Sequence, residues 1–299
     1  MKPLVVIVGP TASGKTALGI KLAKEFGGEI ISADSRAIYR GLSIGTAKPD
    51  AEEQAGIKHW GFDLVDPGER FTAADFKRYA FNKIDEIRSR GNLPIIVGGT
   101  GLYVDAVLYD FQFSESSTDL ARRDRFMAMD LDDLYNYCHK NNVILPENKK
   151  NKRHIVSAIL RNGDVPKSRP KIIENTIIVG ITTDRDELRD RIERRSRVIF
   201  DSGVIQEALN VAREYGWESE AMTGNIYPLV RLYNNGEISR DELERRFAVS
   251  DWRLAKRQLT WFRRNKDIEW LSRDEAYTYI ARHLDTVNKL WYHTYRRGI

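Results

Sequence analysis

A glycine-rich segment near the start of the chain constrains the fold more than any other feature of the sequence. Residues 4–8 (LVVIV) are a continuous run of branched apolar side chains, which is typical of a strand buried on both faces of a parallel sheet. Residues 9–16 (GPTASGKT) follow at once and fit the pattern G-x-x-x-x-G-K-[ST]. Apolar side chains then recur at helical spacing over residues 15–26, until Gly27 and Gly28 stop the pattern. The sequence therefore predicts a phosphate-binding loop between a buried strand and a helix.

Each residue type in such a loop has a role in holding a diphosphate or triphosphate. Glycines let successive backbone N–H groups turn inward onto an anion, and the helix N-terminus adds partial positive charge. Lys15 is placed to reach the outer phosphate, and the Thr16 hydroxyl suits Mg²⁺, so that Thr16 is the predicted metal ligand. The predicted phosphate-binding residues are Gly9, Pro10, Thr11, Ala12, Ser13, Gly14, Lys15 and Thr16. The loop by itself leaves the identity of the phosphate ligand open.

Three more apolar runs, at residues 29–33, 94–97 and 176–181, predict buried strands. Between the first two, residues 73–90 carry apolar side chains on one helical face. Strands that alternate with helices in this way indicate a parallel sheet. We therefore expect an α/β fold, a P-loop NTPase-like doubly wound parallel sheet with a helical insertion and a helical C-terminal region.

The insertion is indicated by a change of pattern in the middle of the chain. Residues 110–170 are polar, charge-dense and weakly helical, and a buried strand follows them. Beyond Asp184 the patterns are almost all helical, apart from a short strand that is possible at residues 268–271. The predicted domains are a phosphate-loop core with C-terminal helices, residues 1–109 and 171–299, and a helical insertion, residues 110–170.

Composition excludes several classes of protein and places the net charge. A chain of 299 residues with 41% hydrophobic and 30% charged residues is typical of a soluble globular protein. The single cysteine, Cys138, cannot form an intrachain disulfide, and no apolar run approaches the roughly 18 residues of a membrane span. We expect a cytoplasmic protein with no membrane partner, and a monomer because no pattern indicates a coiled coil.

The net charge of +5 lies wholly in residues 251–299, which favours a basic surface there that faces a binding partner.

The motifs that accompany nucleotide hydrolysis are incomplete. The base-reading pattern N-K-x-D is reduced to Asn265-Lys266-Asp267, and the strand at 94–97 ends in Gly98-Gly99-Thr100 rather than in an acid. Asp34 ends the neighbouring strand instead. Because ligands bind at the carboxyl ends of parallel strands, we expect Asp34 and Thr100 to point into the phosphate cleft. Asp34 would act as a base for a nucleophile; the alternative roles for this residue are Mg²⁺ binding through water and a helix cap. Thr100 would donate a hydrogen bond.

Five sequence blocks together resemble one known family. They are GPTASGKT (9–16), ISADSRAIYRGLSIGTAKP (31–49), FTAADF (71–76), GGTGLYVDA (98–106) and LAKRQLTWFRR (254–264). In this order they are similar to the blocks of tRNA dimethylallyltransferases, and the resemblance covers the whole chain. Enzymes of this family move a dimethylallyl group from its diphosphate to the exocyclic N6 of the adenosine just 3′ of the anticodon.

The resemblance implies roles for particular residues. It makes dimethylallyl diphosphate the donor and Mg²⁺ the cofactor, Asp34 the base that takes the proton from N6, and Thr100 a contact to the target base or the diphosphate. It also places a diphosphate-binding arginine at Arg195, for which a solvated helix face is the alternative because five arginines crowd residues 189–197. The implied catalytic residues are thus Asp34, Thr100 and Arg195.

The implied macromolecular partner is the tRNA anticodon loop, from which the target base must be taken out of the stack. Helical spacing puts basic side chains of the C-terminal helix on one face, while Trp261 of that helix is better explained by core packing than by base stacking. The predicted tRNA-binding residues are Asp34, Ser35, Arg36, Ala37, Thr100, Arg123, Arg153, His154, Arg253, Lys256 and Arg257.

The sequence departs from the family pattern on the presumed RNA side. Many members have T-R where this chain has Asp251-Trp252, I-G-Y where it has Asn225-Ile226-Tyr227, and glutamine where it has Ala37. The family's R-x-x-R falls on residues 154–157, with His154 and Ser157 at the two arginines, unless the register shifts to use Arg153. These changes bear on which tRNAs are recognised rather than on the chemistry.

Two other functions fit parts of the sequence. Adenylate dimethylallyltransfer would use the same loop and acid but would have little use for the basic helix. A phosphate-loop protein that binds RNA and ATP without prenylation would tolerate the changes on the RNA side.

Overall fold

The computed structural model of the protein describes residues 1–113, 120–146, 148–161 and 169–295. Arg296 and Arg297, which contribute to the basic surplus of the C-terminal region, lie outside the described residues. The chain divides into two compact units. The first comprises Met1–Leu108 and Ile172–Ile299, and the second comprises Tyr109–Lys171.

A six-stranded, all-parallel sheet forms the centre of the first unit, with the strand order β3-β2-β4-β1-β5-β6. Its strands are β1 (Leu4–Val8), β2 (Gly28–Ala33), β3 (His59–Trp60), β4 (Leu93–Gly98), β5 (Thr176–Ile181) and β6 (Glu269–Leu271). The fold class predicted from the sequence is confirmed. β1 lies between β4 and β5, and all five of its side chains are fully buried, which explains its unbroken apolar run.

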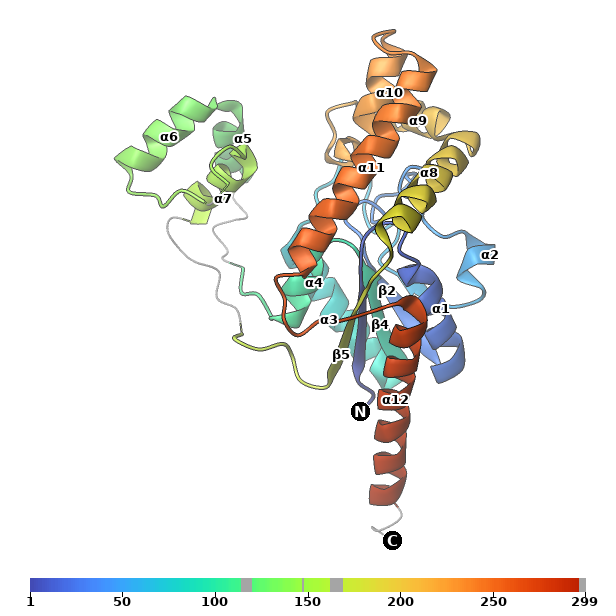
Figure 1. The fold of residues 1–299 in the computed structure, drawn as a ribbon. Helices are drawn as coiled ribbons and strands as arrows, with labels where there is room; N and C mark the ends of the chain where they lie inside the picture. Colours follow the sequence, from blue (N-terminus) through green and yellow to red (C-terminus); the bar gives the residue numbers. More distant parts are fainter. Residues whose placement is uncertain (114–119, 147, 162–168, 296–299) are drawn as a thin grey trace. The chain divides into compact units, whose positions relative to one another are not determined.

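Helices cover both faces of this sheet. Side chains at alternate positions of the strands, among them Val5 and Ile7 of β1, pack against α1 (Lys15–Phe26) and α12 (Arg273–Tyr295). α3 (Ala73–Ser89) and α4 (Gly101–Leu108) contact β4 and each other. Figure 1 shows α1 and α12 on one side of the sheet and α3 and α4 on the other.

The predicted elements differ from the observed ones mainly at their ends. The helix predicted over 73–90 ends at Ser89, and the short C-terminal strand predicted as possible is β6. The sequence patterns did not predict α2 (Ala51–Gln54) or β3. A helix of four residues and a strand of two residues each span only about one period of their pattern, so the pattern does not repeat and cannot be recognised.

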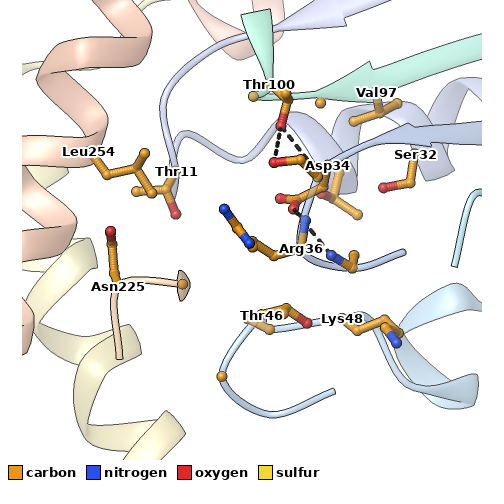
Figure 2. Close-up of a pocket in the computed structure, with 18 of the residues that line it drawn as sticks. Thr11, Ser32, Asp34, Arg36, Thr46, Lys48, Val97, Thr100, Asn225 and Leu254 are labelled. Carbon is orange, nitrogen blue, oxygen red and sulfur yellow. Dashed lines mark hydrogen bonds between the residues drawn. The ribbon is translucent and has the colours of Figure 1, made fainter. Parts of the chain in front are cut away.

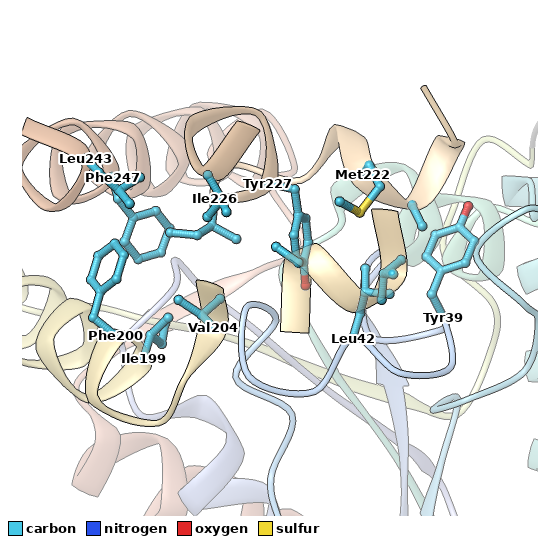
Figure 3. Close-up of a cluster of buried hydrophobic side chains, with 14 of the residues drawn as sticks. Tyr39, Leu42, Ile199, Phe200, Val204, Met222, Ile226, Tyr227, Leu243 and Phe247 are labelled. Carbon is cyan, nitrogen blue, oxygen red and sulfur yellow. The ribbon is translucent and has the colours of Figure 1, made fainter. Parts of the chain in front are cut away.

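A group of helices beyond β5 packs on the loop that follows β2. These elements are α8 (Arg185–Asp201), α9 (Val204–Tyr215), the 3-10 helix η2 (Glu220–Thr223), α10 (Tyr227–Asn234) and α11 (Arg240–Phe262). One hydrophobic cluster joins Ile38, Tyr39 and Leu42 of the loop to side chains from these helices, including Tyr227 and Phe247 (Figure 3). The loop is thereby fixed against the C-terminal helices.

The second unit has a small hydrophobic core of its own. It contains α5 (Leu120–Ala128), α6 (Leu131–Lys140) and α7 (Lys152–Arg161), which bury Leu134, Cys138 and Ile155 together. Across the parts of both units that the structure describes, no helix is long and apolar enough to span a membrane.

Candidate active site

The phosphate loop presents free backbone N–H groups at the start of α1. Ala12 and Gly14 both adopt left-handed backbone conformations, with φ of 61° and 86°. Gly14 is the residue that precedes α1, and no side chain caps the first turn of that helix. The first N–H groups of an α-helix have no partner within the helix, so here they remain available to an anion.

Two side chains of the loop also favour an anionic ligand. Lys15 donates a hydrogen bond from Nζ to the carbonyl oxygen of Pro10 at 3.1 Å. Burial first, and then the positive charge of Arg195, lower the pKa of Lys15 to about 8, while the negative charge of Asp34 opposes this shift. The hydroxyl of Ser13 is buried, and it has no hydrogen-bond partner within the described residues. A bound phosphate would favour the charged form of Lys15.

A cavity of about 460 Å³ joins the phosphate loop to the ends of β2 and β4. Residues from several parts of the chain line it, and Figure 2 shows some of them. They include Thr11, Lys15 and Thr16 of the phosphate loop, Asp34, Ser35, Arg36 and Ala37 after β2, Gly98, Gly99 and Thr100 after β4, Arg195 of α8, and Leu254, Arg257 and Gln258 of α11. The cavity thus contains all three predicted catalytic residues.

Asp34 is held in place by the turn that follows it. Its Oδ1 accepts hydrogen bonds from the backbone N–H groups of Arg36 at 2.8 Å and Ala37 at 3.3 Å. Residues 35–38 form a turn and not a helix, so Asp34 caps a turn and the helix cap considered as its alternative role does not occur here. Within the described residues Oδ2 has no hydrogen-bond partner. One oxygen therefore fixes the carboxylate while the other can accept a proton or a hydrogen bond.

Thr100 lies beside Asp34 because the ends of β2 and β4 approach closely (Figure 2). A Cβ atom at Gly98 would lie 2.3 Å from the carbonyl oxygen of Ala33, so only glycine permits this approach. The hydroxyl of Thr100 accepts a hydrogen bond from the backbone N–H of Ser35 at 3.0 Å and lies 3.3 Å from the Ser35 hydroxyl.

Among the five arginines of residues 189–197, Arg191 and Arg195 are half-buried, and of these two Arg195 lines the cavity. Arg189, Arg194 and Arg197 are exposed, as the solvated-face alternative requires, whereas Arg195 is half-buried and lines the cavity. Its Nη2 donates a hydrogen bond to the carbonyl oxygen of Thr46 at 3.4 Å. Its Nε is buried, and no group in the described chain accepts its hydrogen bond. The guanidinium therefore retains a donor without a hydrogen bond in a side chain that lines the cavity.

Gln258 of α11 is a site residue that the sequence patterns did not single out. Its side-chain oxygen accepts a hydrogen bond from the backbone N–H of Thr11 at 2.8 Å, and its nitrogen donates to the carbonyl oxygen of Gly99 at 3.1 Å. The packing is so close that a Cβ atom at Gly99 would lie 2.2 Å from the Gln258 side chain. Its place in the block LAKRQLTWFRR was the only signal in the sequence.

The basic residues predicted on α11 are exposed. Arg253, Lys256 and Arg257 all reach solvent, and Arg257 also lines the cavity. Trp261 packs against α4, as predicted: its Nε1 donates to Asp105 at 2.7 Å, and its ring occupies the position that a Gly101 side chain would fill.

The remaining predicted tRNA-binding residues belong to the second unit. Arg123 is half-buried on α5, and Arg153 and His154 are exposed on α7. Ser157, one of the departures from the family pattern, accepts a hydrogen bond from Arg161 at 3.3 Å in the same helix.

Two further departures contact each other in the first unit. Nδ2 of Asn225 donates to Oδ1 of Asp251 at 3.1 Å, and both residues line the cavity. Ile226 and Ala37 are both buried, and Ala37 lines the cavity.

The fold and the cavity define a phosphate-loop α/β protein in which an acid and a hydroxyl line the same cavity as the phosphate loop. A family model described as IPP transferase matches residues 37–265. The chain belongs to this family, the tRNA dimethylallyltransferases.

Individual relatives align over nearly the whole chain. A tRNA dimethylallyltransferase of Acetivibrio thermocellus is 39% identical over 92% of this chain and 93% of its own, and that of Bacillus subtilis is 33% identical over 95% and 98%. The crystal structure of a tRNA isopentenylpyrophosphate transferase from Bacillus halodurans covers 98% of this chain and 100% of its own, at 34% identity and a TM-score of 0.74. A eukaryotic dimethylallyltransferase acting on tRNA shares the fold, with a TM-score of 0.78 at 23% identity over 91% of this chain and 74% of its own.

Proposed function

We propose that this protein transfers a dimethylallyl group from dimethylallyl diphosphate to N6 of the adenosine 3′-adjacent to the tRNA anticodon. The observation that carries the proposal is the cavity in which the phosphate loop and the Asp34–Thr100 pair face the same space. A diphosphate held on the loop puts its allylic carbon within a cavity that also contains a base and a hydroxyl. The product is N6-dimethylallyladenosine.

On the donor side, the protein stabilises the leaving diphosphate. The free N–H groups at the start of α1, the Lys15 ammonium and the Arg195 guanidinium meet its oxygens. The bond between C1 of the dimethylallyl group and the diphosphate oxygen breaks, and the diphosphate leaves with the bonding electron pair. Concentrated positive charge lowers the barrier because negative charge grows on the diphosphate as this bond breaks.

Mg²⁺ fits the oxygen donors of this site. No group of three or more His, Cys, Asp or Glu side chains that could hold a metal occurs in the part of the chain that the structure describes. Mg²⁺ does not need such a group, since it is commonly bound by one or two protein oxygens together with substrate phosphates and water. Thr16 would hold it, and the ion would neutralise charge on the leaving diphosphate.

On the acceptor side, Asp34 takes the proton. The N6 amino group of adenine is a weak nucleophile, and it forms its bond to C1 while losing one proton to Oδ2 of Asp34. Oδ1 stays in its hydrogen bonds to the turn and keeps the carboxylate oriented. Thr100, beside it, contacts the target base or the diphosphate.

The RNA contacts come from both units. Residues 35–37 follow the acid directly, and α11 contributes the exposed side chains of Arg253, Lys256 and Arg257, of which Arg257 lines the cavity. In the second unit Arg123, Arg153 and His154 belong to the same proposal. Phosphate contacts of this kind position the anticodon loop while the target base leaves the stack.

Transfer of radiolabel from dimethylallyl diphosphate tests the proposal. The protein is incubated with Mg²⁺ and either an unmodified tRNA transcript or AMP, and a transcript with guanosine at the target position is the matched control. We expect label on the first transcript alone. The matches to tRNA dimethylallyltransferases disfavour both alternatives, but label on AMP alone would establish the adenylate enzyme, and label on no acceptor would establish a binding protein.

Asp34→Asn tests the base. The amide keeps the shape of the side chain and can still accept the two turn hydrogen bonds, so tRNA binding should stay within about twofold. Transfer should fall by about 10²-fold or more, in line with the usual contribution of general base catalysis. Turnover equal to that of the wild type would remove Asp34 as the base.

We also propose that the protein acts as a monomer in the cytoplasm. Cys138, its single cysteine, is free and buried in the second unit. Sedimentation equilibrium should give a mass near 34.5 kDa, and a mass twice as large would contradict the monomer.

A further inference from the structure

The side chain of Glu207 in α9 accepts hydrogen bonds from three consecutive backbone N–H groups. Its Oε2 accepts hydrogen bonds from the N–H groups of Ser43 and Ile44, both at 2.7 Å. Its Oε1 accepts from the N–H group of Gly45 at 2.9 Å and from the hydroxyl of Tyr227 at 3.0 Å. No lysine or arginine of the described residues forms an ion pair with this carboxylate. Hydrogen bonds from the loop and from Tyr227 thus stabilise the negative charge of Glu207.

This arrangement fixes the shape of a loop that has no regular secondary structure. Three consecutive backbone N–H groups that converge on one anion form a concave binding surface, and hydrogen bonds to an ionised acceptor are stronger than neutral ones. Without Glu207 these three N–H groups would have no protein acceptor in the described structure. The Glu207 carboxylate therefore occupies the anion position that a bound ligand fills in anion-binding loops.

Close packing keeps the tyrosine and the loop together. A Cβ atom at Gly45 would lie 2.6 Å from the hydroxyl oxygen of Tyr227, so glycine is required at this point. Tyr227 is itself buried. Burial first, and then the charge of Glu207, raises the pKa of the Tyr227 hydroxyl, so the hydroxyl remains a donor over the physiological pH range.

The same loop continues directly into the candidate active site. Gly45, Thr46 and Lys48 line the cavity that holds the phosphate loop (Figure 2). The carbonyl oxygen of Thr46 accepts a hydrogen bond from Arg195 at 3.4 Å. Arg195 is the arginine proposed to contact the diphosphate, and its buried Nε has no acceptor within the described residues. The position of this side chain therefore depends on a loop that Glu207 holds.

We propose that Glu207 is a positioning residue for the prenyl diphosphate site. It holds residues 43–45 so that the carbonyl of Thr46 directs the Arg195 guanidinium at the diphosphate. It does not touch substrate. The proposal rests on the proposed function only for the identity of the donor, since the diphosphate group alone is what Arg195 would recognise.

Glu207→Gln tests the proposal with little change in volume. The amide nitrogen is a donor facing donors, so at least one loop N–H loses its acceptor. We expect hydrogen exchange at Ser43, Ile44 and Gly45 to speed up. We also expect the affinity for inorganic pyrophosphate to fall by about tenfold, a change that corresponds to about 1.4 kcal/mol. The KM for dimethylallyl diphosphate should rise by a similar factor, while the KM for tRNA stays within about twofold.

Glu214→Gln is the matched control, because Glu214 is exposed on the same helix and does not line the cavity. It should leave all three measurements unchanged. If Glu207→Gln does not fold, Glu207→Asp provides a second variant, since a carboxylate one methylene shorter cannot reach all three N–H groups.

A double-mutant cycle with Arg195→Ala tests whether Glu207 acts through Arg195. If it does, the double variant binds pyrophosphate no more weakly than Arg195→Ala alone, whereas fully additive losses would overturn the proposal. An unchanged pyrophosphate affinity in Glu207→Gln, with faster exchange in the loop, would also overturn it. Absence of prenyl transfer by the wild type would refute the proposed function instead, and the pyrophosphate measurements would still decide the role of Glu207.

Discussion

The side-chain oxygen of Gln258 lies 2.8 Å from the backbone nitrogen of Thr11 and accepts its hydrogen bond. The two residues are 247 positions apart in the sequence. Through this contact α11, which is proposed to bind the RNA, also holds the phosphate loop, which is proposed to bind the diphosphate. The second hydrogen bond of Gln258, to the carbonyl of Gly99, extends the contact to the turn that carries Thr100. One side chain thus joins three parts of the candidate active site.

Gln258→Leu should weaken diphosphate binding without weakening tRNA binding. The substitution removes both hydrogen bonds, and the N–H of Thr11 loses its acceptor, which costs about 1–3 kcal/mol. Calorimetric titration with inorganic pyrophosphate should show an affinity lower by about tenfold or more. Thr260→Ala, an exposed position of the same helix, is the control and should bind normally. A gel-shift assay should give equal tRNA affinity for both variants, and a selective loss of tRNA binding in Gln258→Leu would contradict this account.

The affinity for dimethylallyl diphosphate should fall as the pH rises through about 8. Burial and the positive charge of Arg195 lower the pKa of Lys15 to about 8, so the free protein loses this proton around pH 8, whereas the bound diphosphate favours the protonated form. Binding at pH 8 should therefore be accompanied by proton uptake. Calorimetry without tRNA in buffers of different ionisation enthalpy measures this uptake directly. Lys15→Met should bind weakly and show no uptake linked to this group.

The same titration has the opposite effect on the stability of the free protein. Between pH 8 and the ordinary pKa of 10.5, the unfolded chain holds a proton on Lys15 that the folded chain has lost. The contribution of Lys15 to the free energy of unfolding should therefore increase with pH over this window. Urea denaturation of the wild type and of Lys15→Met, compared at pH 7.5 and 9.5, isolates the contribution. A difference that does not change with pH would contradict the lowered pKa.

The Asn225–Asp251 pair should behave as a unit. Asn225→Ile, which restores the family residue, leaves a buried carboxylate without its partner and should destabilise the protein by about 1–3 kcal/mol. Adding Asp251→Thr removes that carboxylate and should recover part of the loss. Urea denaturation of the two single variants and the double variant gives the interaction free energy, which should be about 0.5–3 kcal/mol. Additive effects would show that the two departures are independent.

Replacing basic residues of α11 should reduce the salt dependence of tRNA binding. Lys256→Gln and Arg257→Gln each remove one charge proposed to contact phosphate. Each should lower the slope of log affinity against log salt by about 0.7–0.9. Lys58→Gln removes an exposed charge from the edge of the sheet near β3 and is the control. If the slope in either α11 variant equals that of Lys58→Gln, that side chain touches no phosphate.

Local patterns in the sequence predicted much of this protein. The apolar run at residues 4–8, the GPTASGKT loop and the helix that follows are features of neighbouring residues, so the chain itself reveals them. The proximity of Asp34 and Thr100 could also be predicted, because these residues end strands whose order and direction the fold class implies. The family blocks then supplied the chemistry that these residues would perform.

The contacts that hold the site together required the tertiary structure. Gln258 meets Thr11, Glu207 meets Ser43 to Gly45, and Asn225 meets Asp251, each across a large gap in the sequence. Periodicity and residue propensity do not predict such contacts. A polar helix residue that faces solvent and one that bonds to a distant loop appear the same in the local sequence pattern. The sequence by itself determined most of the strands, the phosphate loop and the residues proposed for the chemistry, whereas the packing of distant helices decided which side chains hold them in position.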